Sequence, residues 1–263
     1  VVRESLPDLD GQIALNVLEA LARRQGRAVV PETDEEPGRI LHEVRSGEAV
    51  RKVGGWGSTY YGTVDATPLF IMTLAAVHRR GVDDDRVREL LPAAERCLDW
   101  VDRYGDADGD GLIEFPGRAQ GVGLDNQAWK DSHDAVRHRD GSLAIGPIAM
   151  VEVQGYLHRA LLDLAQLRED FATGDGESLR KRATELQERI HELFWMPDEE
   201  CFAMALDGRK QQVGGVATNA GHLLWTRTAY EEQGRALGRR MLAEDLFSGF
   251  GLRTLSSLNP GYN

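Results

Sequence analysis

Residues 123–134 hold the densest group of side chains that could do chemistry, because they combine three carboxylates, an indole and two amides. In a sugar site, carboxylates bond pairs of hydroxyls, a Trp face covers the C–H surface of a pyranose, and a protonated acid can activate a glycosidic oxygen. The same stretch also fits a helix start in which Asp131 or Ser132 caps and Trp129 packs. The candidate residues for catalysis and sugar contact are Asp125, Gln127, Trp129, Lys130 and Asp131.

A second candidate is the loop of residues 106–114, where carboxylates alternate with glycine and other residues. Such a loop can direct its oxygens toward one hard cation such as Ca²⁺. It begins like an EF-hand, but its twelfth position is Gly117 instead of a bidentate Glu. The alternative is an Asp/Gly-rich turn whose side chains cap its own backbone. The candidate calcium ligands are Asp106, Asp108, Asp110, Leu112 through its carbonyl, and Glu114.

The third candidate is the segment from Tyr61 to Asp65, which directly precedes an apolar stretch with Pro68 near its start. Pro in the first turn is typical of a helix, so Asp65 could simply cap that helix with its side-chain oxygens. In the functional alternative, Asp65 and Tyr61 project from the end of an inner helix into a central cavity. An ionised carboxylate there would hold sugar hydroxyls.

The elements that must position these residues are predicted to be helices. Apolar residues recur every three or four positions over residues 87–101 and 179–194, which is typical of helices that bury one face. Residues 69–77 and 148–167 are apolar on more than one side, which predicts inner-layer helices. Further helices are expected at residues 13–21, 217–225 and 230–243, and one strand at residues 201–206. About seven helices without a convincing linker favour one domain over residues 1–263.

Charge and cysteine content restrict the partners. Asp and Glu total 43 against 31 Lys and Arg, a formal net charge of −12, so no nucleic acid partner is expected, because phosphates require a basic face. The two cysteines, Cys97 and Cys201, lie far apart, which predicts reduced thiols and a cytoplasmic location. No segment has the apolar length of a membrane span, and no motif indicates zinc or an organic cofactor. A carbohydrate is the expected partner.

In their order along the chain, these motifs resemble the glycogen debranching enzymes of the amylo-α-1,6-glucosidase type, which are (α/α)6-toroid glycoside hydrolases. Tyr61-Gly-Thr-Val-Asp65 is similar to the family's Tyr-x-Ser-x-Asp, and Gln127-Ala-Trp129-Lys130-Asp131 is similar to its Thr-Trp-Met-Asp. Residues 219–222 and 249–255 are similar to two later stretches of that family. The resemblance covers most of the chain from Pro37 onward.

The resemblance implies an all-α fold, the (α/α)6 toroid, in which Asp65 holds the terminal glucose and Asp131 is the general acid. It also implies a calcium loop, because related toroid glucosidases carry Asp or Asn at alternate positions followed by Glu, as residues 106–114 do. The family's catalytic base, a Glu, comes from a late part of the toroid, which implies that the toroid is incomplete at the C-terminus. Asp125 is a rival acid, because some related glycosidases carry theirs in a Gly-x-Asp-Asn-like context.

The expected activity is hydrolysis of an α-glucosidic bond, of the debranching type, with inversion at the anomeric carbon. Inversion requires acid and base carboxyls about 6.5–9.5 Å apart, so that a water molecule fits between base and sugar. Two alternatives stay open. One is hydrolysis of a small glucoside such as glucosylglycerate or trehalose, and the other is a non-catalytic, sugar-binding helical module.

Overall fold

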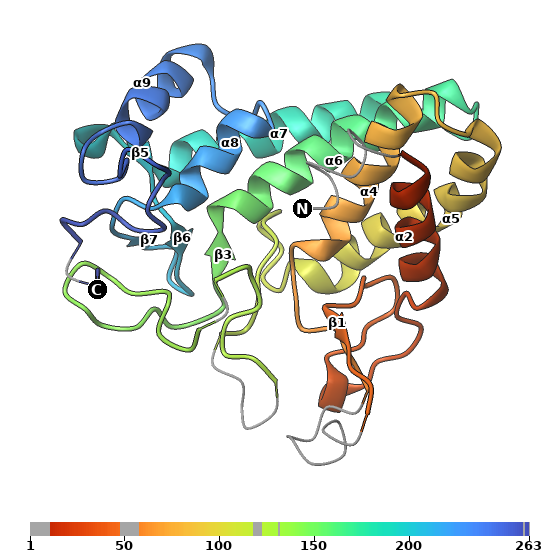
Figure 1. The fold of residues 1–263 in the computed structure, drawn as a ribbon, viewed down its shortest axis with the longest axis horizontal. Coiled ribbons are helices and arrows are strands. Elements are labelled where there is room, and N and C mark those ends of the chain that lie inside the picture. The colour runs from red at the N-terminus through yellow and green to blue at the C-terminus, as the bar shows by residue number, and fades with distance from the viewer. Residues whose placement is uncertain (1–10, 48–57, 118–122, 131, 260, 263) are drawn as a thin grey trace.

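The computed structural model describes residues 11–47, 58–117, 123–130, 132–259 and 261–262. Helices dominate this part of the chain, as the apolar periodicity predicts (Figure 1). The α-helices are α2 (Gly11–Arg23), α4 (Ala66–Arg79), α5 (Asp84–Trp100), α6 (Val151–Asp170), α7 (Glu177–Phe194), α8 (His222–Trp225) and α9 (Glu231–Met241). Shorter turns are the 3-10 segments η1 (Pro31–Thr33), η3 (Pro197–Glu199) and η4 (Thr218–Gly221) and the π turn η2 (Val101–Gly105).

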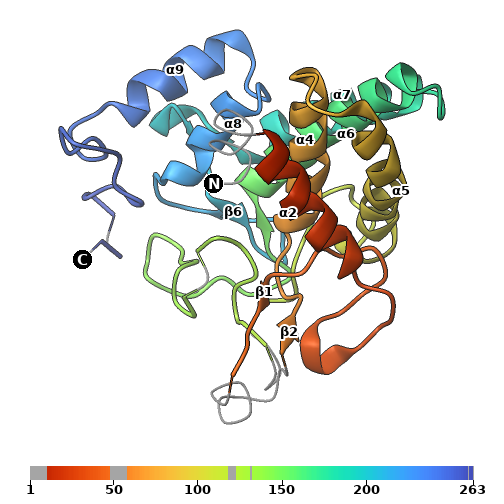
Figure 2. The same cartoon turned by 45° about the vertical axis from the view of Figure 1, so that its right-hand side comes forward.

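The helices form an inner and an outer layer. α4 and α6 lie side by side, and α2, α5, α7 and α8 pack around them (Figures 1 and 2). Buried residues follow one another along α6 from Val151 to Leu167, whereas the buried residues of α5 and α7 fall on one stripe. The prediction of inner helices with several packed faces and outer helices with one is confirmed. Among the described residues, no helix is both long enough and apolar enough to cross a bilayer.

The strands are antiparallel ladders of two residues each. β1 (Glu43–Val44) pairs with β2 (Thr59–Tyr60), and β4 (Trp195–Met196) pairs with β5 (Cys201–Phe202). β6 (Ala205–Leu206) lies between β3 (Ala149–Met150) and β7 (Gln212–Val213). These ladders connect the loops to the helix ends.

The prediction of one strand over residues 201–206 is wrong, because β5 and β6 belong to different sheets. The backbone between them bonds to helix ends: Ala203 donates to the carbonyl of Phe194 at 2.7 Å, and Met204 accepts from Val151 at 3.0 Å. These bonds join the end of α7 to the start of α6. Tertiary contacts therefore override the local pattern here.

Candidate functional site

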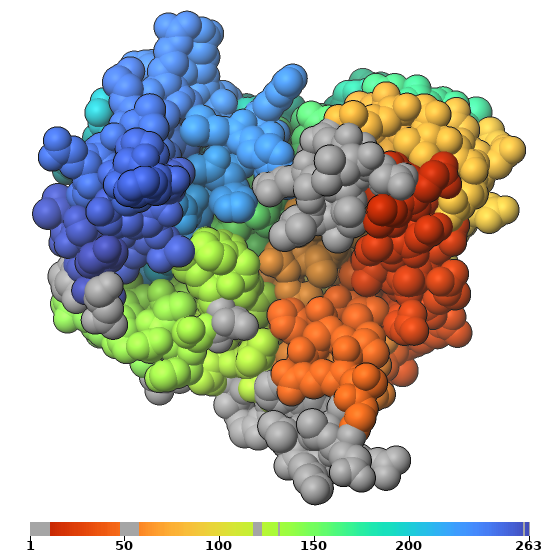
Figure 3. All heavy atoms as spheres, viewed as in Figure 1, coloured from red at the N-terminus to blue at the C-terminus, as the bar shows by residue number. Residues whose placement is uncertain are grey.

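A cavity of about 520 Å³ lies where α2 and the first residues of α4 face α6 and α8. In the space-filling view, the orange atoms of α4 are recessed between the red-to-orange N-terminal segments and the yellow-green loops (Figure 3). The apolar lining consists of Leu18, Leu21, Ile40, Leu41, Ala66, Leu69 and Phe70. The polar and aromatic lining consists of Asp65, Thr73, Trp129, Tyr156, His222 and Trp225. The cavity thus combines one carboxylate with an aromatic wall.

The aromatic wall is held together by direct contacts. Tyr156 Oη lies 2.7 Å from His222 Nδ1, and the Tyr156 ring meets Trp225 edge-on with centroids 5.9 Å apart. The Trp129 ring lies 6.3 Å from the His222 ring and is 42% exposed. Aromatic rings offer apolar faces to the C–H surface of a sugar. The hydrogen bond between Tyr156 and His222 fixes the orientation of these two side chains.

Asp65 directly precedes α4, but its side chain makes no capping hydrogen bond to that helix. Thr63 Oγ1 donates a short hydrogen bond to its carboxylate instead. Burial raises the pKa of Asp65, and the Thr63 hydroxyl and the charge of His42 oppose that shift. Asp65 therefore forms no side-chain cap and lines the cavity instead, and its sugar-holding role stays a prediction.

Lys130 directly follows Trp129 in the chain but is not itself part of the cavity lining. Its Nζ donates to the carbonyl of Thr254 at 2.7 Å and lies 5.1 Å from the centre of the Trp129 ring, in cation–π contact. Burial lowers the pKa of Lys130 to about 8, and the charge of Glu152 opposes this decrease. Lys130 therefore remains mostly cationic at pH 7 beside the aromatic wall.

The other predicted sugar-binding residues are placed differently. Tyr61 Oη donates to the carbonyl of Arg24 at 2.7 Å, and Gln127 Oε1 accepts from Arg39 at 2.6 Å. Neither side chain belongs to the cavity lining, and Asp125, which is partly buried, does not belong to it either. Asp131, the predicted general acid, lies outside the described residues.

The acidic loop holds an internal cation. Lys210 Nζ, from the turn between β6 and β7, lies 2.9 Å from Asp108 Oδ2 and 2.7 Å from Asp110 Oδ2 and also contacts Glu114. These carboxylates raise the pKa of Lys210 above its ordinary value although burial opposes them. Asp106 accepts the backbone N–H groups of residues 109–111, as the turn alternative predicts.

The donor set of this loop still fits a hard cation in part. Oxygens of Asp106, Asp108 and Glu114 lie within 4.8 Å of one another, and Glu114 Oε2 is buried without a hydrogen-bond partner. Burial raises the pKa of Glu114 despite the nearby ammonium. Leu112 contributes its backbone N–H to Asp110. Calcium at this loop therefore stays a prediction, and Lys210 would compete with it.

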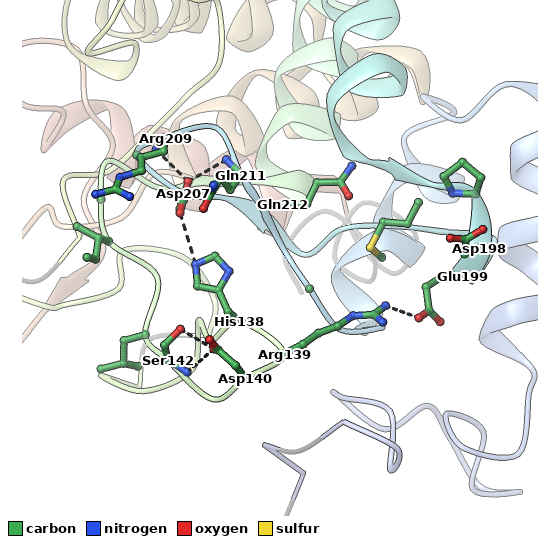
Figure 4. A pocket seen from close by; sticks show the side chains of 17 residues that line it. His138, Arg139, Asp140, Ser142, Asp198, Glu199, Asp207, Arg209, Gln211 and Gln212 are labelled. Atoms are coloured by element: carbon green, nitrogen blue, oxygen red, sulfur yellow. Dashed lines mark hydrogen bonds and ion pairs between the residues drawn. The ribbon is translucent and has the colours of Figure 1, made fainter.

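A second, larger cavity of about 990 Å³ lies between the loop of residues 138–146, η3 and the turn that joins β6 to β7 (Figure 4). Four of its charged or titratable side chains form two pairs: His138 Nε2 lies 3.4 Å from Asp207, and Arg139 is ion-paired with Glu199. No buried side-chain polar atom of its described lining lacks a hydrogen-bond partner. These ion pairs hold the loops around the cavity in place.

The class of the chain follows from a comparison with protein-family models. The mannosylglycerate hydrolase MGH1-like glycoside hydrolase domain matches residues 6–263. The chain belongs to this glycoside hydrolase family. The comparison with curated proteins gives no match.

Three solved structures resemble this glycoside hydrolase. The GH63 mannosylglycerate hydrolase from Thermus thermophilus in complex with Tris and D-glycerate is 14% identical, with a TM-score of 0.69 over 100% of this chain and 73% of that chain. The rhamnosidase from Klebsiella oxytoca with rhamnose bound is 19% identical, with a TM-score of 0.53 over 90% and 40%. The neutral trehalase from Saccharomyces cerevisiae is 14% identical, with a TM-score of 0.53 over 74% and 46%.

At these identities the likeness shows the fold, and the fold is that of the (α/α)6 glycosidases. The predictions of an all-α toroid class and of a glycosidase are thereby confirmed. The matching family is the MGH1-like one, and nothing in the comparisons supports the debranching type. The small-glucoside alternative agrees better with this family.

Glu152 is a buried carboxyl group of this glycoside hydrolase that the sequence motifs did not indicate. It has no exposed surface, and burial raises its pKa to about 7. The available signal was an acidic residue between Val151 and Val153 in an otherwise apolar stretch. Buried carboxyls with shifted pKa values often occur at functional sites.

Asp65→Asn is expected to lower kcat/KM for a glycoside substrate about 10- to 100-fold, because charged hydrogen bonds to sugar hydroxyls contribute about 1.5–3 kcal/mol. The melting temperature at pH 7 should not decrease, because the change removes a carboxylate whose burial is unfavourable. Asp85→Asn, at the start of α5 and highly exposed, is the matched control and should change neither quantity. Equal kcat/KM for Asp65→Asn and wild type would exclude Asp65 from sugar binding.

Proposed function

We propose that the protein hydrolyses a small α-glycoside whose aglycone carries a negative charge, of the glucosylglycerate or mannosylglycerate kind. The observation that carries this proposal is the ammonium of Lys130, which lies 5.1 Å from the ring centre of Trp129. Trp129 belongs to the aromatic wall of the cavity of about 520 Å³. A cavity of that size suits a compact ligand. The mannosylglycerate hydrolase of similar fold was solved with D-glycerate, whose carboxylate would pair with such an ammonium.

The roles follow from the chemistry of each group. Asp65 holds glycone hydroxyls, and the Trp129 face covers the C–H surface of the sugar. Asp131, next to Lys130 in the chain, is the proposed general acid that protonates the glycosidic oxygen, with Asp125 as the rival. Inversion needs a second carboxylate that activates water from the opposite side of the sugar, and no described residue is assigned that role.

Kinetics on a substrate panel test this proposal. We expect kcat/KM for glucosylglycerate or mannosylglycerate to exceed that for trehalose and α-1,6-branched dextrin, because only the first two offer a carboxylate to Lys130. Proton NMR of the first product formed should show the inverted, β-configured sugar. A preference for branched dextrin would overturn the substrate proposal, and sugar binding without turnover would support the non-catalytic module.

Lys130→Met should lower kcat/KM for the glycerate glycoside about 10- to 100-fold, because a charge-assisted hydrogen bond to the carboxylate is lost. The value of kcat/KM for trehalose, which has no carboxylate, should fall much less. Lys181→Met, which removes an exposed lysine on α7, is the control. An equal loss on both substrates would show that Lys130 does not recognise the aglycone charge.

A further inference from the structure

Arg39 is a buried arginine whose guanidinium group joins three segments of the chain. Its side chain is only 5% exposed. Nε donates to the carbonyl of Thr63 at 3.2 Å, Nη1 to the carbonyl of Asp34 at 3.0 Å, and Nη2 to Oε1 of Gln127 at 2.6 Å. Nη1 also lies 3.2 Å from a carboxylate oxygen of Glu36. One planar group therefore holds these segments in a single arrangement.

Further hydrogen bonds join the same segments without Arg39. The Tyr60 hydroxyl donates to Asp34 Oδ2 at 2.7 Å and accepts from the backbone N–H of Leu124 at 2.8 Å. The backbone N–H of Val64 donates to the carbonyl of Gln127 at 2.8 Å. The loop that contains Leu124 and Gln127 is thus fixed to the segment that leads into α4, and Arg39 bonds to both.

The two joined segments continue directly into the cavity lining. Thr63 lies two residues before Asp65 and donates its hydroxyl to that carboxylate. Gln127 lies two residues before Trp129. Asp65 and Trp129 both line the cavity of about 520 Å³, whereas Arg39, Thr63 and Gln127 do not belong to the lining. Arg39 therefore bonds to the chain just ahead of both cavity residues and is not placed to touch a ligand itself.

We infer that Arg39 is a positioning residue that fixes Trp129 relative to Asp65, so that a sugar held by the carboxylate lies against the indole face. This inference rests on the proposed function, because it uses the sugar-binding roles proposed for those two residues. Lys130 bonds the end of the same loop to the carbonyl of Thr254, and Arg39 anchors the loop ahead of Trp129. A displacement of about 1 Å between a substrate and its catalytic groups can lower the rate about 100-fold.

The variant Arg39→Lys separates the charge of this residue from its geometry. The donors of arginine point in fixed directions in one plane, whereas a lysine ammonium is a point charge on a flexible stem. Lysine therefore keeps a positive charge beside Glu36 but cannot reproduce the bonds to Thr63 and Gln127 together. Any loss in Arg39→Lys reports the missing fork.

Arg39→Lys is expected to lower kcat for the glycerate glycoside about 10- to 100-fold, because the sugar is no longer aligned with the groups that act on it. Arg168→Lys is the matched control, because it removes the same fork from a bidentate pair with Glu95 between α6 and α5. The control should lower the melting temperature but leave kcat unchanged. Both variants are assayed well below their melting temperatures, so that unfolding does not lower the rate. Unchanged kcat in Arg39→Lys would leave it a structural residue only.

Gln127→Met tests the same link from the other partner, and also if Arg39→Lys does not fold. Methionine has about the length of glutamine but offers no carbonyl to the guanidinium. We expect a similar fall in kcat, and the double variant should lose little more than either single variant, because both changes break one contact. Losses that multiply in the double variant, or wild-type kcat in Gln127→Met, would overturn the inference.

A measurement without turnover distinguishes this inference from the proposed function. Incorporation of 5-fluorotryptophan gives one fluorine-19 signal for each of the five tryptophans, and Trp129→Phe identifies the signal of Trp129. In Arg39→Lys that signal should shift or broaden, while the signal of Trp195 in β4 should stay in place. The signal of Trp100 is not used, because Arg39 lies directly over its ring at 5.2 Å.

The outcomes of this measurement do not depend on activity. An unmoved Trp129 signal would overturn the inference even in an active hydrolase, and so would an equal shift in Arg168→Lys. A shift confined to Arg39→Lys, without hydrolysis of any glycoside, would support the positioning of Trp129 and reject the proposed function. A shift together with the fall in kcat supports both.

Discussion

Asp131→Asn is expected to reduce hydrolysis of an unactivated glycoside about 10²- to 10⁴-fold, the usual contribution of a positioned general acid. Asn keeps the size of the side chain but has no proton to give to the leaving oxygen. Trp129, two residues before Asp131 in the chain, lines the cavity in which the proposed sugar would bind. Binding of the sugar, measured by calorimetry, should change little.

The matched control is Asp125→Asn, which changes the rival acid in the same loop. If Asp131 is the acid, Asp125→Asn retains most of its activity on the natural glycoside. A glycosyl fluoride needs no protonation of its leaving group, so Asp131→Asn should hydrolyse it almost as fast as wild type. A large loss on the fluoride as well would show that Asp131 has a different role, and a large loss only in Asp125→Asn would exchange the two assignments.

The helices were predictable because their sequence signal is local. Residues 87–101 and 179–194 repeat their apolar positions at helical spacing, and α5 and α7 bury those stripes. The placement of Asp65 and Trp129 in the cavity agrees with the chemistry that their types indicate. Asp65 directly precedes α4, so its position follows from the local helix signal, whereas Trp129 lies in the long loop between η2 and β3.

Side-chain direction was harder to predict than residue type. Tyr61 and Gln127 belong to the same motifs as Asp65 and Trp129, but their polar atoms bond to Arg24 and Arg39. Those partners are 37 and 88 residues away in the chain. A motif identifies which groups could bind a sugar, but the long-range partners decide which of them remain available for it.

The long-range contacts of Glu152 and Lys210 also could not be predicted from the sequence. Lys210 contacts Glu114 across 96 residues of chain, and no spacing rule relates the two positions. Burial raises the pKa of Glu152, and the charges of Lys130 and Asp65, which lie on other segments, modify that shift. Periodicity correctly assigned Glu152 to a helix, but the electrostatic contacts between segments arise only in the folded chain.

Lys210→Met is expected to lower the free energy of unfolding by about 2 to 3 kcal/mol, because it leaves several carboxylates together without their cation. The value lies below that of a fully buried ion pair, because the side chains of Lys210 and Asp108 are 26% and 41% exposed. Glu114, whose side chain has no exposed surface, carries most of the effect. Urea unfolding at pH 7 measures it.

Lys181→Met is the control, because that lysine is 78% exposed and pairs with Glu185 one turn away. We expect a change within about 0.5 kcal/mol. Millimolar Ca²⁺ should stabilise Lys210→Met more than wild type, since removal of the ammonium frees the oxygens of Asp108 and Glu114 for the metal. Equal stabilisation of both proteins would mean that calcium and Lys210 do not compete. Equal stability of Lys210→Met and Lys181→Met would mean that the ammonium does not hold the acidic loop.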